Sequence, residues 1–279
     1  MRIFDGKKEA QRILVQLKSR IKKEKLSPSL AVLLVGRNPE SLIYIRNKKI
    51  AAKKVGIKVI ISKFRKNIGE KKVIAKIKEF NNNSSIDGII VQLPLPEKFD
   101  TSKIINAIDF KKDVDGFCQK NRELLKKSKP YFFPVLPWAI FTVLKHISGL
   151  EDKKIIALVN SDIFGKTIKV FFERKGIKIE YLLKNKNKFS KLKSADIIIS
   201  VKGLPRFIKA DMIKKNAALI DAGIRIVNGK IVGDVDKEGM QEKASFLTPV
   251  PGGLGPLTVA LLLTNVYLAS KRKNNSKIG

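Results

Sequence analysis

The sequence predicts an α/β protein in which two alternating units each build a parallel sheet covered by helices. Three observations support this fold class. Short apolar runs typical of buried strands alternate with segments whose apolar residues recur at helical spacing. Short turns connect them, as in parallel sheets that are covered on both faces. The length of 279 residues is sufficient for two such units.

The first unit, residues 1–135, starts with an amphipathic helix and then alternates strand and helix. Expected strands cover residues 29–35, 57–61 and 86–91, and expected helices cover residues 7–25, the segment from the turn at 36–39 to Gly56, 71–80 and 102–108. Because strands in this order are parallel, their carboxyl ends meet at one edge of the sheet. Ligands bind at that edge in open α/β sheets.

The second unit, residues 136–254, has the pattern of a Rossmann-like dinucleotide-binding domain. Expected helices cover residues 136–147 and 165–175, and expected strands cover residues 154–159, 177–183, 195–200 and 217–221. A final helix, about residues 255–270, is expected to pack back on the first domain. The tail 271–279 is too polar to fold alone, so we expect it to be frayed.

The chain is strongly basic, with 58 Lys and Arg against 25 Asp and Glu and a net charge of +33. Only 11 of the 58 are arginine. Lysines scattered through every predicted helix indicate a solvated surface, whereas nucleic-acid sites favour clustered arginine. A basic nucleic-acid-binding protein on an enzyme scaffold stays open as an alternative. The charge should also attract anionic ligands, including phosphate-bearing cofactors.

Two reactive residue types occur once each. Cys118 is the only cysteine, which excludes an intrachain disulfide and a cysteine-clustered metal site and is typical of a reducing cytoplasm. His146 is the only histidine and lies in an apolar stretch away from the motifs below, so we expect a structural or surface role. The first residues lack the apolar core of a signal peptide, and no apolar run approaches about 18 residues. We expect a cytoplasmic protein without a metal.

Tyr44 and Lys48 are the first candidate site residues. They lie four residues apart on the predicted helix that follows the strand at 29–35, so their side chains share one helix face. We place this face near the N-terminal end of the helix, where the carboxyl edge of the sheet opens. A phenol and an amine at this edge of the sheet can contact the same substrate molecule. The alternative is a tyrosine ring packed on a lysine stem at a solvated surface.

Three further motifs accompany this pair. Gln92 ends the third strand and precedes the rigid segment 93–96, for which a plain proline stop is the alternative. Asp115 lies in the polar turn 112–116, where a carboxylate is often a cap or a surface charge. The loop 248–258 is rich in proline and glycine, which the N-terminus of the last helix also explains.

Together these motifs resemble the bifunctional methylenetetrahydrofolate dehydrogenase/methenyltetrahydrofolate cyclohydrolase family, called FolD in bacteria. The matching segments are Tyr44-x3-Lys48 and residues 87–96, 112–117 and 248–258. The resemblance runs in order from about Phe4 to about Ala269. Four motifs in the right order and spacing are far more specific than any one of them.

The resemblance implies one-carbon folate chemistry in the first domain. In this family 5,10-methylenetetrahydrofolate gives a hydride to NADP, and the 5,10-methenyl cation is hydrolysed to 10-formyltetrahydrofolate in the same cleft. Motif by motif, Lys48 would be the general acid/base, Gln92 its hydrogen-bonding partner and Tyr44 a catalytic residue beside the folate. The substrate-binding residues would be Tyr44, Asp115, which would grip the pterin, and Pro251, Gly252 and Gly253 of the closing loop.

The nucleotide loop departs from the family pattern. The family usually carries Gly-Arg-Ser and then Val-Gly-Lys-Pro, whereas residues 159–167 of this chain read Val-Asn-Ser-Asp-Ile-Phe-Gly-Lys-Thr. Val159 replaces the glycine that lets the backbone approach phosphate, and Asn160 replaces the arginine that pairs with a 2′-phosphate. Further on, residues 183–186 replace a His-Ser-x-Thr segment and offer lysines as point charges. The cofactor-binding residues implied by the resemblance are Val159, Asn160, Ser161, Gly165, Lys166 and Ile224.

NADP is the expected cofactor, with NAD, or weak or lost dinucleotide binding, as the alternatives. The alternative function is a cyclohydrolase that has lost its dehydrogenase activity. The expected partners are the folate, the dinucleotide and a second copy of the chain in a homodimer. No metal, membrane or nucleic acid is expected.

Overall fold

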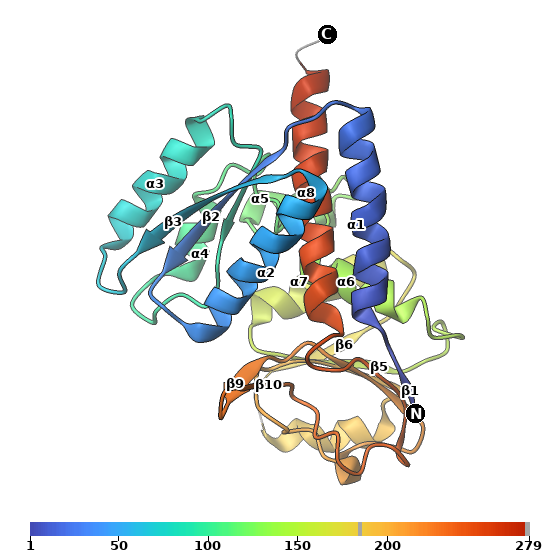
Figure 1. Cartoon of the computed structure of the whole chain (residues 1–279). Coiled ribbons are helices and arrows are strands. Elements are labelled where there is room, and N and C mark those ends of the chain that lie inside the picture. The colour runs from blue at the N-terminus through green and yellow to red at the C-terminus, as the bar shows by residue number, and fades with distance from the viewer. Residues whose placement is uncertain (184–185, 277–279) are drawn as a thin grey trace. The chain divides into compact units, whose positions relative to one another are not determined.

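A computed structural model describes residues 1–183 and 186–276 (Figure 1). The chain divides into two compact units. The three-stranded unit comprises residues 10–135 and the chain from residue 259 onward, and the six-stranded unit comprises residues 1–9 and 136–258. Residues 1–9, which we predicted in the first domain, lie with the six-stranded unit because their strand pairs in parallel with one of its strands.

The three-stranded unit is built on a parallel sheet with the strand order β3-β2-β4. Its strands are β2 (Ser29–Val35), β3 (Lys58–Phe64) and β4 (Gly88–Val91), and the helices before, between and after them are α1 (Gly6–Lys23), α2 (Pro39–Val55), α3 (Glu70–Asn82), α4 (Thr101–Asn106) and α5 (Gln119–Lys126). The central strand β2 is buried along its whole length because both neighbours pair with it. An isolated parallel bridge between Ile89 and Asp113 adds the turn before α5 to the edge of β4.

Helix α2 has well-defined ends. The side chain of Asn38 accepts a hydrogen bond from the Ser41 N–H at 2.9 Å, and Pro39 occupies the first turn, where a missing N–H costs nothing. At the other end, Gly56 has a φ of +83° and its N–H turns back to the carbonyls of the last turn. The two ends of the helix are therefore fixed by local sequence.

Helix α8 (Leu254–Asn275) is largely buried. In the part of the chain that the structure describes, it is the one helix long and apolar enough to cross a membrane, and 67% of the relevant window is buried inside the protein. The buried core helix of a soluble protein can have the same length and apolar composition, so these two properties alone are weak evidence for a membrane span. Inside the three-stranded unit the Asn265 amide of α8 donates to the carbonyl oxygens of Val114 and Phe133, at 2.8 and 3.0 Å.

The prediction of a frayed tail from residue 271 is wrong as far as Asn275, because α8 continues there. Its charged side chains have partners that hold them. The Lys271 ammonium lies 2.8 Å from the Glu24 carboxylate, the Arg272 guanidinium donates to a backbone carbonyl at 2.7 Å, and Lys273 pairs with Asp87. The prediction from polar composition therefore ended the helix several residues too early.

The six-stranded unit has the strand order β1-β11-β8-β7-β5-β6, and all neighbours are parallel. Its strands are β1 (Arg2–Ile3), β5 (Ile155–Val159), β6 (Glu180–Leu182), β7 (Ile197–Val201), β8 (Ala217–Asp221) and β11 (Ala244–Leu247), with the hairpin β9 (Arg225–Val227) and β10 (Lys230–Val232), the helices α6 (Val135–Leu144) and α7 (Asp162–Glu173), and the short helices η1 (Lys186–Ser194) and η2 (Ala210–Met212). The chain passes from β5 to β6 on one side and returns to β7 on the other. The switch point of the sheet therefore lies between β5 and β7.

The predicted α/β fold class is confirmed, including the parallel sheets of both units. Four short strands and α5 were not predicted: β1, β9, β10 and β11 have two to four residues each, too few to show a period. The helix expected over 165–175 begins earlier, at Asp162, because the Ser161 hydroxyl caps it. The domain boundaries at residues 135 and 254 stay a prediction.

Candidate active site

The carboxyl edge of the three-stranded sheet carries the first group of predicted site residues. Gln92 follows β4 directly, and its N–H donates to the Leu33 carbonyl of β2 at 2.8 Å. Gln92 thus continues the ladder one residue past the strand, and its side chain is 8% exposed. Helix α2 starts from the same edge, after the turn that follows β2. Lys48 lies at the middle of this helix, not near its N-terminal end as predicted, because the helix already begins at Pro39.

Lys48 and Gln92 are joined by a direct hydrogen bond. The Lys48 Nζ donates to Gln92 Oε1 at 2.7 Å. The Gln92 Nε2 donates in turn to the Leu93 carbonyl at 2.8 Å, which orients the amide so that its oxygen faces the lysine. The Leu93 carbonyl also accepts from the Ser41 hydroxyl of α2, at 3.2 Å. The segment after β4 and helix α2 therefore hold the Lys48 head group in one place.

Burial changes the acid–base properties of this lysine. It lowers the pKa of Lys48 to about 8, while the negative charge of Asp115 acts in the opposite direction. A lysine in water has a pKa near 10.4, so its neutral form is scarce at pH 7. At a pKa of about 8, roughly one Lys48 in ten is neutral at pH 7. An amine with this pKa can both accept and return a proton near neutral pH.

Tyr44 lies one turn before Lys48 on α2, as predicted from the spacing. The Lys48 Nζ is 5.9 Å from the centre of the Tyr44 ring. Burial, and secondarily the charge of Glu40, raise the pKa of Tyr44 to about 12. The phenol therefore stays protonated, and it can donate a hydrogen bond or offer its ring face but cannot serve as the base.

Asp115 lies in the turn that the Ile89–Asp113 bridge places beside β4. Its side chain is half-buried. Burial raises the pKa of Asp115 to about 6, and the charge of Lys48 acts against this shift. Each of the two charged groups therefore stabilises the other. Above pH 6 the carboxylate is available as an acceptor for N–H groups of a ligand at this edge.

The sequence reasoning missed the residues that hold the Asp115 turn. The buried Asp113 carboxylate accepts from the Cys118 N–H at 2.8 Å and from the Asn121 amide at 2.9 Å. Burial raises the pKa of Asp113 and of the Cys118 thiol. The Asn265 amide of α8 anchors the same turn through the Val114 carbonyl. The first Asp of the Asp-Val-Asp pattern and the nearby Asn121 are local in sequence, whereas Asn265 lies 151 residues from Val114.

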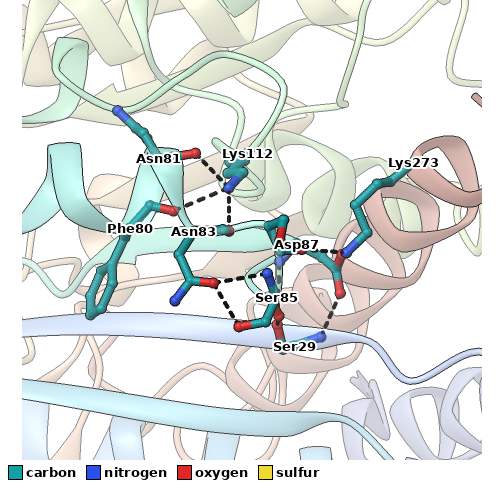
Figure 2. A network of polar contacts seen from close by, with 9 residues as sticks. Ser29, Phe80, Asn81, Asn83, Ser85, Asp87, Lys112 and Lys273 are labelled. Carbon is teal, nitrogen blue, oxygen red and sulfur yellow. Dashed lines mark hydrogen bonds and ion pairs between the residues drawn. The ribbon is translucent and has the colours of Figure 1, made fainter. Parts of the chain in front are cut away.

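Figure 2 shows a polar network at the opposite, amino-terminal end of the same strands. The Lys112 ammonium donates to the carbonyls of Phe80, Asn81 and Asn83 at 3.1, 2.6 and 2.8 Å, which caps the end of α3. The fully buried Asp87 carboxylate accepts from the Ser29 N–H at 2.8 Å and pairs with Lys273 of α8. These contacts fix the start of β4 and one end of the Asp115 turn.

The predicted nucleotide loop lies at the carboxyl end of β5 in the six-stranded unit. The Ser161 hydroxyl caps α7 by accepting from the Phe164 N–H at 3.3 Å, so the helix starts directly after Ser161. Asp162 accepts a hydrogen bond from the Tyr181 hydroxyl at 2.7 Å and pairs with Lys166 at 2.6 Å. These contacts lower the pKa of Asp162 and raise that of Lys166. Lys166 therefore does not offer an uncompensated charge to a ligand.

Gly165 is needed for packing within this unit. A Cβ atom at Gly165 would lie 2.3 Å from the Tyr181 ring. Val159 is fully buried in β5, whereas Asn160 is exposed and Ile224 is half-buried after β8. Of residues 183–186, Lys184 and Asn185 lie outside the described residues.

The donors at this edge fit a dinucleotide. A helix N-terminus with a hydroxyl cap lies at the switch point of a parallel sheet, which is the usual place for a diphosphate. The buried Lys202 ammonium reaches the Val159 carbonyl at 3.0 Å, at the start of the loop. The sequence reasoning did not identify this contact.

Pro251, Gly252 and Gly253 form a tight turn before α8 in the six-stranded unit. The Gly253 N–H donates to the Pro249 carbonyl at 2.7 Å, and Gly252 has a φ of +109°. A Cβ atom at Gly6 would lie 1.8 Å from the Gly253 carbonyl oxygen, so the turn is packed against the start of α1. The contact of these residues with substrate stays a prediction.

Among the described residues, no three His, Cys, Asp or Glu side chains are grouped as metal ligands would be. The expectation of a metal-free site stays a prediction. His146 is exposed, and its ring packs edge-on against Phe4 with 5.2 Å between ring centres. This is the surface or structural role expected from the sequence.

The chain matches two family models in succession. Residues 4–115 match the tetrahydrofolate dehydrogenase/cyclohydrolase catalytic domain, and residues 134–274 match the NAD(P)-binding domain of the same family. The chain belongs to the tetrahydrofolate dehydrogenase/cyclohydrolase family. It is 41% identical to the bifunctional protein FolD of Aquifex aeolicus, over 97% of this chain and 96% of that protein.

Solved structures of family members are also similar. The FolD enzyme of Campylobacter jejuni is 34% identical, with a TM-score of 0.88 and coverage of 98% of this chain and 99% of that one. The Trypanosoma brucei enzyme, solved with NADP cofactor and an inhibitor, is 27% identical with a TM-score of 0.87 and covers 97% of both chains. The resemblance stated from the motifs is confirmed. The comparisons give no support to a cyclohydrolase-only protein or to a nucleic-acid-binding one.

The pKa of Lys48 predicts how hydrolysis depends on pH. If its neutral amine accepts the proton, the enzymatic rate on 5,10-methenyltetrahydrofolate should rise between pH 7 and 9 with an apparent pKa of about 8. Below about pH 6 protonation of Asp115 should raise the KM for folate. Initial rates, corrected for the uncatalysed reaction, test both the rise in rate from pH 7 to 9 and the rise in KM below about pH 6. A rate that is constant from pH 7 to 9 would exclude Lys48 as the titrating group.

Proposed function

We propose that Lys48, Gln92 and Tyr44 form the catalytic group at which this enzyme carries out both reactions of its family. These are the NADP-dependent oxidation of 5,10-methylenetetrahydrofolate to 5,10-methenyltetrahydrofolate and its hydrolysis to 10-formyltetrahydrofolate. The observation that supports the assignment is the 2.7 Å hydrogen bond from Lys48 to Gln92 at the carboxyl edge of the sheet. It joins a lysine with a lowered pKa to the place where such sheets bind ligands.

Hydrolysis requires a base because water loses protons as it attacks the methenyl carbon. Lys48 in its neutral form takes up such a proton, and its protonated form can return one when the ring C–N bond breaks. Gln92 holds the amine by accepting one of its hydrogen bonds and is itself held by the Leu93 carbonyl. A cationic substrate nearby would favour the neutral lysine further.

Oxidation requires less acid–base assistance from the protein side chains than hydrolysis does. The folate nitrogens stabilise the cation that forms, so no strong base is needed, and bound NADP supplies the hydride acceptor. The chain's own residues then act by positioning the folate carbon. Tyr44 is suited to contact the folate, since its phenol stays neutral over the working pH range.

Asp115 is the proposed anchor for the pterin. A carboxylate that accepts two N–H bonds from a heterocycle edge gives both charge and direction. The buried Asp113, with Asn121 and the Cys118 N–H as its donors, limits the positions that Asp115 can take. Substrate contacts of Pro251, Gly252 and Gly253, a cytoplasmic location and a homodimer belong to this proposal as implications of the resemblance.

Lys48→Met should abolish cyclohydrolase turnover, by about 100-fold or more, while folate binding stays measurable. The amine transfers protons, and the methionine keeps most of the apolar stem. Hydrolysis of methenyltetrahydrofolate and equilibrium folate binding are measured on the same preparation. Lys49→Met, which alters the exposed neighbouring lysine, is the control. An unchanged hydrolysis rate in Lys48→Met would remove this residue from the mechanism.

Asp115→Asn should weaken folate in both reactions together, with a rise in KM of roughly tenfold for each, since anchoring of the pterin precedes either step. The two activities are assayed separately, with methylene- and methenyltetrahydrofolate as substrates. The exposed Glu242→Gln is a matched loss of one carboxylate. A defect in one activity alone would contradict the anchoring role.

Asn160 bears on recognition of the 2′-phosphate of NADP. With Asn160 in place of arginine, NADP should bind more weakly than in a family member with that arginine, by about 1.5–3 kcal/mol, or roughly tenfold to a hundredfold. Asn160→Arg should therefore tighten NADP about tenfold and leave NAD, which lacks the 2′-phosphate, unchanged. Dissociation constants for both nucleotides test this. Micromolar saturation of the unmodified enzyme by NADP would refute the weakening.

A further inference from the structure

The turn that carries Asp115 is buried except at that residue. Asp113, Val114 and Gly116 are buried, whereas the Asp115 side chain is half-buried. Its carboxylate and the Lys48 ammonium stabilise each other's charge. Because an aspartate side chain is short, the place of its carboxylate follows closely from the place of its backbone. The groups that hold this backbone therefore decide where the carboxylate lies.

Asn265 of α8 binds two backbone segments that meet at Asp115. Its Nδ2 donates to the Val114 carbonyl, the group directly before Asp115, at 2.8 Å, and to the Phe133 carbonyl at 3.0 Å. Two residues after Phe133, the Val135 N–H donates to the Asp115 carbonyl at 3.1 Å. One side-chain amide thus ties α8 to both segments, and a backbone bond joins those segments at Asp115 itself.

Two glycines allow close packing around the same turn. A Cβ atom at Gly88 of β4 would lie 2.7 and 2.9 Å from the two methyl carbons of Val114. At Gly116, which has a φ of +77°, a Cβ atom would lie 2.9 Å from the Pro134 Cα. Apolar contacts of this kind have no preferred direction, whereas hydrogen bonds do. The two bonds donated by Asn265 therefore add the orientation that packing alone does not give.

The other atom of this amide indicates that the side chain serves position more than stability. Asn265 is 1% exposed, and its Oδ1 has no hydrogen-bond partner among residues 1–183 and 186–276. A buried acceptor without a partner lowers stability. An apolar side chain of similar size, such as leucine, would avoid this cost but could not donate to either carbonyl. The two donated bonds are therefore what an asparagine supplies here.

We propose that Asn265 is a positioning residue for folate binding, which acts by holding the Asp115 carboxylate at the carboxyl edge of the three-stranded sheet. This inference rests on the proposed role of Asp115 as the anchor of the pterin. Asn265 is buried and does not touch the substrate. It joins α8 to substrate recognition, while the hydrogen bond between Lys48 and Gln92 does not involve it. Loss of Asn265 therefore acts on affinity and not on proton transfer.

Asn265→Leu removes both donated bonds and keeps a side chain of similar size. The KM values for 5,10-methylene- and 5,10-methenyltetrahydrofolate should each rise about fivefold to tenfold, with each kcat within about twofold of the unmodified enzyme. Initial rates of the two reactions, measured separately, give all four constants. Tyr267→Phe is the matched control, because it removes a hydrogen bond of 2.8 Å from the same helix to Glu24. It should leave both KM values unchanged.

A double-mutant cycle with Asp115→Asn separates this role from a general loss of stability. If Asn265 acts through the Asp115 carboxylate, Asn265→Leu should raise either KM by less than about twofold in the Asp115→Asn background. Equal increases in both backgrounds would overturn the proposal, as would an unchanged KM or a loss confined to kcat in Asn265→Leu alone. If Asp115→Asn by itself leaves both KM values unchanged, the anchoring role of Asp115 fails and this inference falls with it. That outcome is distinguishable because Asn265 is intact in that variant.

A second variant covers a leucine variant that does not fold, as judged by thermal unfolding without ligand. Asn265→Ala vacates the space beside the two carbonyls, so that water can bind them there. The turn then loses its link to α8 without a bulky apolar group next to its carbonyls, and both KM values should again rise about fivefold to tenfold. Unchanged KM values in the folded alanine variant would overturn the proposal without any use of the leucine variant.

Discussion

The hydrogen bond between Lys48 and Gln92 depends on the parallel sheet beneath it. Gln92 reaches the lysine because its own N–H continues the β2–β4 ladder past the end of β4, and Lys48 reaches Gln92 because α2 starts at the same edge. A shift of β4 by one residue would turn the Gln92 side chain to the other face. The register of the short strand β4 thus decides whether Lys48 can donate to Gln92. The pKa of Lys48 in turn depends on the burial of its side chain at this edge of the sheet.

This register is held from the far end of the strands. Asp87, directly before β4, binds the first N–H of β2 and the ammonium group of Lys273. Lys112 ties the Asp115 turn to the end of α3 (Figure 2). A four-residue strand has few ladder bonds of its own, so these buried polar contacts contribute to its position. Residues remote from the chemistry therefore set its geometry.

The sequence predicted what depends on local spacing and motif order. Tyr44 and Lys48 share a helix face, Gln92 ends a strand, and the two parallel sheets follow from alternation. It did not predict contacts between segments far apart in the chain, such as Asn265 with the Asp115 turn, 151 residues away from Val114. It was wrong about the tail from residue 271 because composition cannot show that Glu24 and Asp87 lie beside it. Local patterns carry no information about such partners.

The same limit explains why composition says little about the contacts of an individual lysine. Most of the 58 basic residues are solvated, and their charge affects association with anions in general. Lys48 and Lys202 differ from them in one respect, which is that each lies at the carboxyl edge of a parallel sheet and donates to an acceptor fixed by a neighbouring strand. At Lys48 burial favours the neutral amine, which suits proton transfer. At Lys202 the acceptor is the last carbonyl of β5, beside a helix N-terminus. The strand ends around a lysine, and not its abundance in the chain, therefore set the contacts that distinguish it from the solvated lysines.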